Sequence, residues 1–220
     1  MVDAIADTVD DNCCAVPFTG RFLMIDRETI SVYDDRAGEY AKLLNKQAPD
    51  AQLVAFMRLL PGGAQVLDLG CGPATTSAHL RDAFFRPDPV DASAGMVMLA
   101  NETFDINARV MTFDEIDMDG AYDGVWANFS LLHAPRTDLG RHLAAIAKAL
   151  LPARIFSIGM KTGVVEARDR IGRMYTYVTI PELSGLLVDA GFSILAVDEG
   201  EGVGLAGDVD PWVVIRARKD

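Results

Sequence analysis

The stretch Val66-Leu67-Asp68-Leu69-Gly70-Cys71-Gly72-Pro73-Ala74-Thr75 is the most informative part of the chain. Residues 64–69 form a short apolar run that predicts a buried strand, and residues 75–83 show the pattern of a helix. Gly70 and Gly72 stand between them, where the lack of a side chain lets the backbone turn tightly and approach a ligand closely. The sequence therefore predicts a strand, a turn and a helix, with a ligand at the carboxyl end of the strand.

Strand and helix patterns continue to alternate beyond this stretch. Strand-like runs occupy residues 89–91, 108–111, 122–127, 154–159, 192–197 and 212–216, and helical runs occupy 93–101, 139–151 and 181–190. Strands that alternate with helices pair in parallel through right-handed crossovers. The last two strands lack an intervening helix, which favours a hairpin. We expect a doubly wound α/β fold with a mostly parallel seven-stranded sheet and one antiparallel strand.

The N-terminal part of the chain differs from this core. Residues 1–30 show no sustained period and are expected to be a variable or mobile extension, whereas residues 31–220 are expected to form a single domain. The spacing of apolar residues predicts amphipathic helices at 33–46 and 51–60. These two helices are expected to form an N-terminal cap on the sheet.

Charge and hydropathy limit the possible partners. The formal net charge of −12 and the isoelectric point near 4.6 disfavour nucleic acid and anionic membrane surfaces. A basic patch within residues 154–173 is the one alternative to that conclusion. The apolar stretches are too short to span a bilayer, and residues 1–11 lack the basic start of a signal peptide, so a cytoplasmic location is expected.

The three cysteines support neither a disulfide framework nor a zinc site. Cys13 and Cys14 are adjacent, and Cys71 lies in the glycine-containing turn, so no pair stands at a metal-ligand spacing. The two adjacent cysteines are either reactive thiols or small apolar residues in an N-terminal tail. No metal is expected.

Two classes of nucleotide-like cofactor use a glycine-containing turn after a first strand. A dinucleotide fingerprint needs a third glycine where this chain has Thr75, which weakens that interpretation. Asp68, two residues before Gly70, supplies a carboxylate for a cationic amino-acid group. The stretch resembles the first motif of class I S-adenosylmethionine-dependent methyltransferases, with Ala74 in place of the usual third glycine. The resemblance implies a Rossmann-like fold that binds S-adenosylmethionine and covers roughly residues 33–191.

The resemblance assigns further cofactor contacts after the second and third strands. Asp91 would accept hydrogen bonds from both ribose hydroxyls, with Ala92 and Met96 beside it, although it would also suit a cap for the following helix. Phe113 and Asp114 would contact adenine, the carboxylate accepting from the exocyclic amine. An exposed acidic loop around Asp114 is the alternative interpretation.

The segment of residues 122–133 resembles the part of the family in which the fourth strand ends at the methyl-transfer centre. Asn128 and Phe129 would flank the sulfonium, and His133 would follow one turn later. With an ordinary pKa near 6.5, His133 is a candidate general base for the methyl acceptor. The alternative is a histidine that only packs or caps a loop, because many methyltransferases act mainly by aligning the methyl group with its acceptor.

Arginines and tyrosines gather where the resemblance places a lid over the substrate. Arg168, Arg173 and Tyr175 are candidates to bind an anionic or aromatic small molecule, with a solvated helix as the alternative. Tyr33 and Tyr40 resemble the tyrosines of the family's cap, where Tyr33 would contact the cofactor and Tyr40 the substrate. Both tyrosines would also suit an apolar core.

The sequence thus predicts S-adenosylmethionine-dependent methyl transfer to an O, N, S or C nucleophile of a small molecule. A protein that binds S-adenosylmethionine or S-adenosylhomocysteine without turnover is the first alternative, and a nicotinamide-dependent oxidoreductase is the second. The turn at residues 151–154 departs from the Pro-Gly-Gly common in the family. Ala153 is therefore expected to avoid positive φ, with that loop rebuilt.

Overall fold

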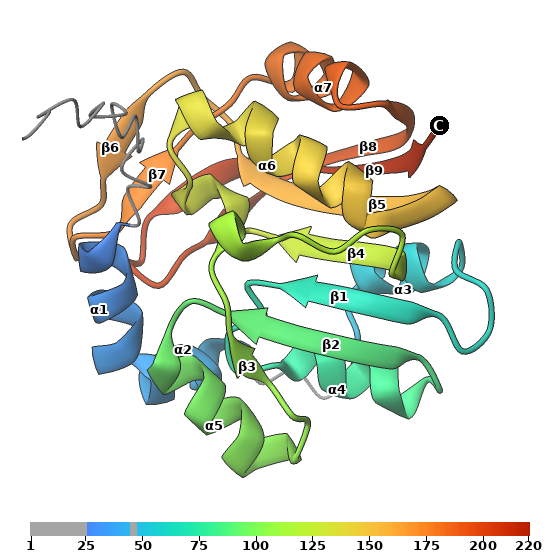
Figure 1. Cartoon of the computed structure of the whole chain (residues 1–220). Helices are drawn as coiled ribbons and strands as arrows, with labels where there is room; N and C mark the ends of the chain where they lie inside the picture. Colours follow the sequence, from blue (N-terminus) through green and yellow to red (C-terminus); the bar gives the residue numbers. More distant parts are fainter. Residues whose placement is uncertain (1–25, 45–47) are drawn as a thin grey trace, which may run out of the picture.

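A seven-stranded sheet forms the centre of the protein, in the order β3-β2-β1-β4-β5-β9-β8 (Figure 1). The computed structural model describes residues 26–44 and 48–220; Cys13, Cys14 and most of the expected N-terminal extension lie outside these ranges. The strands are β1 Gln65–Leu69, β2 Arg86–Asp91, β3 Arg109–Val110, β4 Tyr122–Asn128, β5 Leu150–Lys161, β8 Phe192–Val203 and β9 Val209–Lys219. All pairs are parallel except those of β9, which runs antiparallel to both β5 and β8. The expected seven-stranded α/β fold with one antiparallel strand is confirmed.

Helices cover both faces of the sheet because the side chains of β1 alternate in direction. The helices are α1 Arg27–Asp35, α2 Ala37–Leu44, α3 Ala51–Met57, α4 Thr75–Asp82, α5 Ala94–Phe104, α6 Arg136–Ala149 and α7 Ile180–Asp189, with short 3-10 turns at Phe113–Glu115 and Leu131–His133. Val66 packs with residues of α3 and α4, whereas Leu67 and Leu69 pack with residues of α6 and α7. Figure 1 shows α6 and α7 on the opposite face from α3 and α4.

The N-terminal cap begins earlier than its apolar spacing predicts. The expected single helix at 33–46 is two helices, α1 and α2, separated at Arg36, and α1 starts at Arg27 inside the segment expected to be an extension. Residues 27–32 carry no apolar period, so tertiary contacts stabilise this turn of helix instead. Among them, the Thr29 hydroxyl accepts a hydrogen bond of 2.8 Å from the backbone N–H of Met174.

A second, two-stranded sheet replaces the helix considered for the arginine-containing segment. Strand β6 (Glu166–Arg168) pairs antiparallel with β7 (Met174–Thr176). Figure 1 places this hairpin beside α1, on the side of the molecule where β1, β2 and β4 end. The sequence pattern does not predict this hairpin, because each strand has only three residues, too few to show an alternating apolar period.

The expectation for Ala153 is wrong. Ala153 adopts a φ of +59°, so the turn keeps the left-handed geometry that glycine usually supplies. The residue lies within β5 where the pairing with β4 shifts register between Tyr122 and Gly124. This irregularity leaves residues of β5 between Leu150 and Ile155 without a partner on β4, and alanine has the smallest side chain that carries a Cβ.

Candidate functional site

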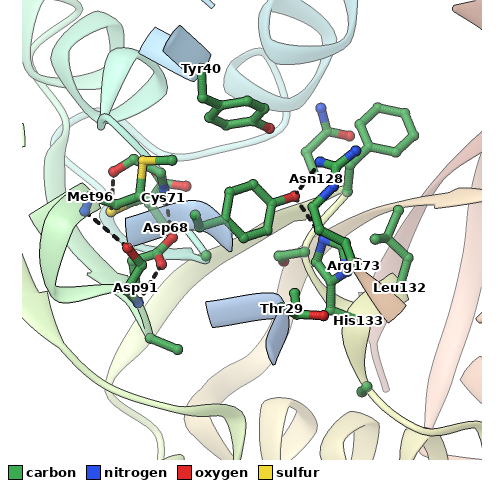
Figure 2. A pocket seen from close by; sticks show the side chains of 18 of the residues that line it. Thr29, Tyr40, Asp68, Cys71, Asp91, Met96, Asn128, Leu132, His133 and Arg173 are labelled. Atoms are coloured by element: carbon green, nitrogen blue, oxygen red, sulfur yellow. Dashed lines mark hydrogen bonds between the residues drawn. The ribbon is translucent and has the colours of Figure 1, made fainter. Parts of the chain in front are cut away.

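One cavity of about 550 Å³ lies at the carboxyl ends of β1, β2 and β4 and collects nearly all the predicted site residues. The predicted residues that line it are Tyr33, Tyr40, Asp68, Gly70, Cys71, Gly72, Asp91, Ala92, Met96, Phe113, Asp114, Asn128, Phe129, His133, Arg173 and Tyr175. Figure 2 shows two groups facing one another across it, with Asp68, Cys71 and Asp91 on one side and Asn128, His133 and Arg173 on the other. Only Arg168, among the predicted site residues, does not line the cavity.

The glycine-containing turn is hydrogen-bonded to the second strand, and it has no room for a side chain at Gly70. The backbone N–H groups of Gly70 and Cys71 both donate to the carbonyl of Val90, at 2.8 and 2.9 Å. Gly70 has a φ of +75°, and a Cβ at this position would overlap the Cβ of Ser130. Ala74 is fully buried with a φ of +59°, so it takes the left-handed conformation of the glycine that the motif usually has here.

Asp91 ties the turn to the end of the second strand. One carboxylate oxygen accepts from the backbone N–H of Gly72 at 2.8 Å and the other from that of Ser93 at 2.9 Å. Burial raises the pKa of this carboxyl, while the two N–H donors oppose that shift. The N-cap of α5 is Ser93, whose hydroxyl accepts from Met96 N–H, so capping alone does not account for Asp91. An ionised carboxylate has further lone pairs, which suits ribose hydroxyls.

Asp68 is buried beside Asp91, with a side chain only 2% exposed. Its carboxylate accepts a hydrogen bond of 2.7 Å from the hydroxyl of Ser77. Burial, together with the nearby charge of Asp91, raises the pKa of Asp68 to about 7. A cationic ligand group in the cavity would favour the ionised form.

Asp114 lies in the cavity wall and not in an exposed acidic loop. Its side chain is 11% exposed and forms an ion pair of 2.6 Å with Arg141 of α6. Phe113 packs edge-on against His142, with ring centroids 5.6 Å apart. Sequence reasoning missed Arg141 and His142, which come from a helix that the motif does not include.

His133 has a defined tautomer and is neutral. Its Nδ1 lies 2.6 Å from the carbonyl oxygen of Met174, which can only accept, so Nδ1 carries the proton. Nε2 then accepts from the hydroxyl of Tyr33 at 2.9 Å. Burial lowers the pKa of His133 to about 4, and the charges of Arg173 and Lys161 lower it further.

Arg173 is oriented by a carboxylate that the sequence analysis missed. Its guanidinium is 2% exposed and donates from Nε and Nη2 to Asp169, at 3.0 and 2.8 Å. Its Nη1 donates to the hydroxyl of Tyr33 at 2.9 Å. Arg168, by contrast, does not line the cavity; its side chain is 40% exposed and forms ion pairs with Asp26 and Glu28.

The residues that line the cavity without having been predicted include Lys161, Asp210 and Trp212. These three residues come from the ends of β5 and β9, where a strand pattern alone does not show which residues face a ligand. Asn128 also lines the cavity, and its buried amide oxygen has no hydrogen-bond partner within residues 26–44 and 48–220.

In the part of the chain that the structure describes, no three His, Cys, Asp or Glu side chains gather as a group that could hold a metal ion. None of the helices within residues 26–44 and 48–220 combines the length and apolar character needed to cross a bilayer.

Residues 66–153 match a family described as a methyltransferase domain, which includes the glycine-containing turn, Asp91 and His133. These residues form a methyltransferase domain; the enzyme is an S-adenosylmethionine-dependent methyltransferase, and S-adenosylmethionine is its cofactor. It is 27% identical to a magnesium-protoporphyrin O-methyltransferase of Rhodobacter capsulatus over 167 residues, covering 70% of this chain and 75% of the relative.

Two solved structures show the same fold. One is a 1,6-didemethyltoxoflavin-N1-methyltransferase of Burkholderia thailandensis with 1,6-didemethyltoxoflavin and S-adenosylhomocysteine bound; its TM-score is 0.68 at 24% identity, covering 90% of this chain and 91% of that one. The other is an S-adenosylmethionine-dependent methyltransferase of Methanosarcina mazei, with a TM-score of 0.67 at 18% identity, covering 75% of this chain and 96% of that one.

Proposed function

We propose that this enzyme transfers a methyl group from S-adenosylmethionine to a small molecule bound between the glycine-containing turn and the Arg173–Tyr175 segment. The observation that carries the proposal is that one cavity of about 550 Å³ joins these two groups of residues. Cavities of roughly 300–1,000 Å³ are typical of small-molecule sites. The strongly acidic chain disfavours nucleic acid as the acceptor.

The residues around the turn are proposed to bind and orient the cofactor. When bound, S-adenosylmethionine supplies a methyl group made electrophilic by the adjacent positive sulfur. Asp91 would accept from the ribose hydroxyls, Asp68 would face the amino-acid end, and Asp114 with Phe113 would face adenine. Asn128 and Phe129 at the end of β4 would then lie between cofactor and acceptor, where they limit how the acceptor approaches.

The acceptor is proposed to be activated mainly by its position. His133 is a weak base with a pKa of about 4, and the lone pair of Nε2 already accepts from Tyr33. A general-base step through His133 therefore has two routes. In one, Tyr33 moves aside and Nε2 takes the proton of the methyl acceptor directly. In the other, the hydroxyl oxygen of Tyr33 takes that proton while its own proton passes to Nε2. The general-base role of His133 stays a prediction, and the contacts support a role in holding Tyr33.

The named relatives support a small acceptor. One is named for magnesium protoporphyrin and the other for 1,6-didemethyltoxoflavin, and both names describe methyl transfer to a small molecule. The similarity to the R. capsulatus relative extends over 70% of this chain and 75% of that protein.

The test is a methyl-transfer assay with S-adenosylmethionine labelled in its methyl group and a panel of hydroxyl-, amine-, thiol- and carbon-acid small molecules. We expect labelled product from at least one class, lost in Asp91→Ala and kept in Asp82→Ala, which removes a carboxylate from the exposed side of α4. Binding of S-adenosylhomocysteine without transfer to any member of the panel would contradict the proposal and favour a binding protein without turnover.

A further inference from the structure

The ends of three strands form one wall of the cavity, and their register places five residues on one face. Lys161 of β5 is directly opposite Trp212 of β9, and Trp212 is directly opposite Gly200 of β8. Asp210, two residues from Trp212 and therefore on the same face, is opposite Gly202. Residues directly opposite one another in antiparallel strands point to the same side of a sheet, so these five residues share one surface.

Two glycines allow the indole of Trp212 to lie flat on the strand beside it. A Cβ at Gly200 would overlap the six-membered ring of the indole, and one at Gly202 would lie 3.4 Å from its Nε1. Phe129 meets the same indole edge-on, with ring centroids 6.3 Å apart. Trp212 also lines the cavity, so the glycines and Phe129 fix an aromatic surface before any ligand binds.

A charged pair lies next to this aromatic surface. Nζ of Lys161 is 2.6 Å from a carboxylate oxygen of Asp210, and the side chains are 13% and 18% exposed. The ammonium also lies 3.8 Å from the ring centroid of Tyr175, and the hydroxyl of Tyr177 donates to the other oxygen of Asp210 at 3.2 Å. The ammonium has three donors and the carboxylate about four acceptor sites, so each can bind a ligand while they remain paired.

From this arrangement we propose that the methyl acceptor is a planar aromatic ring with a carbonyl or anionic oxygen beside an N–H or O–H on one edge. The ring lies against Trp212, its oxygen accepts from Lys161, and its neighbouring donor binds Asp210. The inference rests on the proposed function, because it names the acceptor class of that same cavity. Trp212, Lys161 and Asp210 are then the residues that determine specificity, and the glycines position Trp212.

The experiment measures binding to the enzyme saturated with S-adenosylhomocysteine, by calorimetry and by the emission of Trp212. Replacing the other tryptophan, Trp126→Phe, leaves Trp212 as the single reporter, because the chain has two tryptophans. The probe is lumazine, a planar ring with adjacent carbonyl and N–H groups. Its matched control is 1,3-dimethyllumazine, in which both N–H groups of the dione are methylated.

We expect lumazine to bind and to change the Trp212 emission, and 1,3-dimethyllumazine to bind at least about tenfold more weakly, since a hydrogen bond to a charged group is lost. Lys161→Met and Trp212→Leu should each weaken lumazine binding about tenfold, and Gly200→Ala should weaken it by displacing the indole. Arg170→Met, an exposed charge that does not line the cavity, should leave it unchanged. Affinity for S-adenosylhomocysteine should stay the same in all variants and shows that each is folded.

Equal affinity for the two lumazines, no lumazine binding, or unchanged lumazine affinity in Lys161→Met and Trp212→Leu would overturn the inference. Transfer of methyl to aliphatic acceptors alone would also overturn it while leaving the proposed function intact. Binding of lumazine through Trp212 without methyl transfer to any small molecule would contradict the proposed function, and with it the role of the ring as methyl acceptor, while leaving the Trp212 surface as a binding site for such a ring.

Discussion

The hydroxyl of Tyr33 lies 2.9 Å from Nε2 of His133, which joins the cap helix α1 to the loop that follows β4. The same oxygen accepts from Nη1 of Arg173, also at 2.9 Å. Three groups that are distant in the sequence are thus connected through one atom. The direction of each bond is fixed, because Met174 requires a proton on Nδ1 of His133 and arginine can only donate.

Replacing Tyr33 with phenylalanine should lower the free energy of unfolding by about 2 kcal/mol. The change leaves a buried guanidinium N–H and a buried imidazole nitrogen without a partner, and each such group costs about 1–3 kcal/mol. Chemical denaturation measures the difference. Tyr40→Phe is the matched control, since no hydrogen bond of its hydroxyl is seen within residues 26–44 and 48–220, and an equal loss in both variants would contradict the prediction.

His133 should make the stability depend on pH between about 4 and 6.5. Its pKa is about 4 in the folded protein, lowered mainly by burial, against about 6.5 when unfolded. Between these values the unfolded chain binds more protons, so the free energy of unfolding rises with pH, by about 3 kcal/mol in total from this group. His133→Gln should flatten that part of the pH–stability curve, and a curve parallel to that of the wild type would refute the shift.

Asp34 should hold the cap over the cofactor side of the cavity. Its carboxylate accepts from the hydroxyl of Ser93 at 2.6 Å and from the backbone N–H of Gly95 at 2.9 Å, both at the start of α5. Asp34→Ala should weaken S-adenosylhomocysteine binding about tenfold, because a smaller fraction of the protein has the cap in place. Calorimetry measures this. Asp35 is an exposed neighbour in the same helix, so the Asp35→Ala variant should bind S-adenosylhomocysteine as tightly as the wild type. If the Asp34→Ala and Asp35→Ala variants had equal affinities, Asp34 would not hold the cap in place.

Gly70 should tolerate no side chain. Gly70→Ala combines a φ of +75° with a Cβ that overlaps Ser130, so we expect a loss of about 3 kcal/mol in the free energy of unfolding. Gly62→Ala is the control, because a Cβ there meets nothing within 4 Å. Ser130→Gly added to Gly70→Ala should recover part of the loss, and no recovery would show that the overlap is not its cause.

Replacing Ala153 with glycine should make the protein more stable. Its φ of +59° costs an L-residue roughly 1 kcal/mol, which glycine avoids at the expense of a more flexible unfolded chain. We expect Ala153→Gly to raise the free energy of unfolding by about 0.5 kcal/mol. Ala145→Gly, within α6, should lower it by about 1 kcal/mol. Destabilisation by both changes would show that the turn at Ala153 carries no strain.

Periodicity and glycine placement predicted the sheet well because both depend on local sequence. The run before Gly70 predicted a buried strand, and the missing helix between the last two strands favoured a hairpin and hence one antiparallel strand. The start of α1 at Arg27 was missed because its residues carry no apolar period and depend on contacts such as that of Thr29 with β7. Ala153 was predicted wrongly because the rule for positive φ considers the residue and not the bulge around it.

The cavity residues near the motif were predictable for the same local reason, since strand ends in a parallel sheet meet at one edge. Arg168 and Arg173 could not be told apart by sequence, because the difference lies in their partners: Asp26 and Glu28 for the exposed Arg168, and Asp169 with Tyr33 for the buried Arg173. Trp212 and Lys161 were missed because their shared face follows from strand register, which no single run of residues reveals.

The contacts of α1 also constrain the order in which the protein is completed on the ribosome. The helix is bound through Asp34 to residues 93 and 95, and through Thr29 and Tyr33 to residues 173 and 174. A nascent chain can complete the glycine-containing turn and its first strands long before residue 173 has emerged. Although α1 is synthesised before the whole sheet, it cannot make its full set of contacts until most of the chain has been translated.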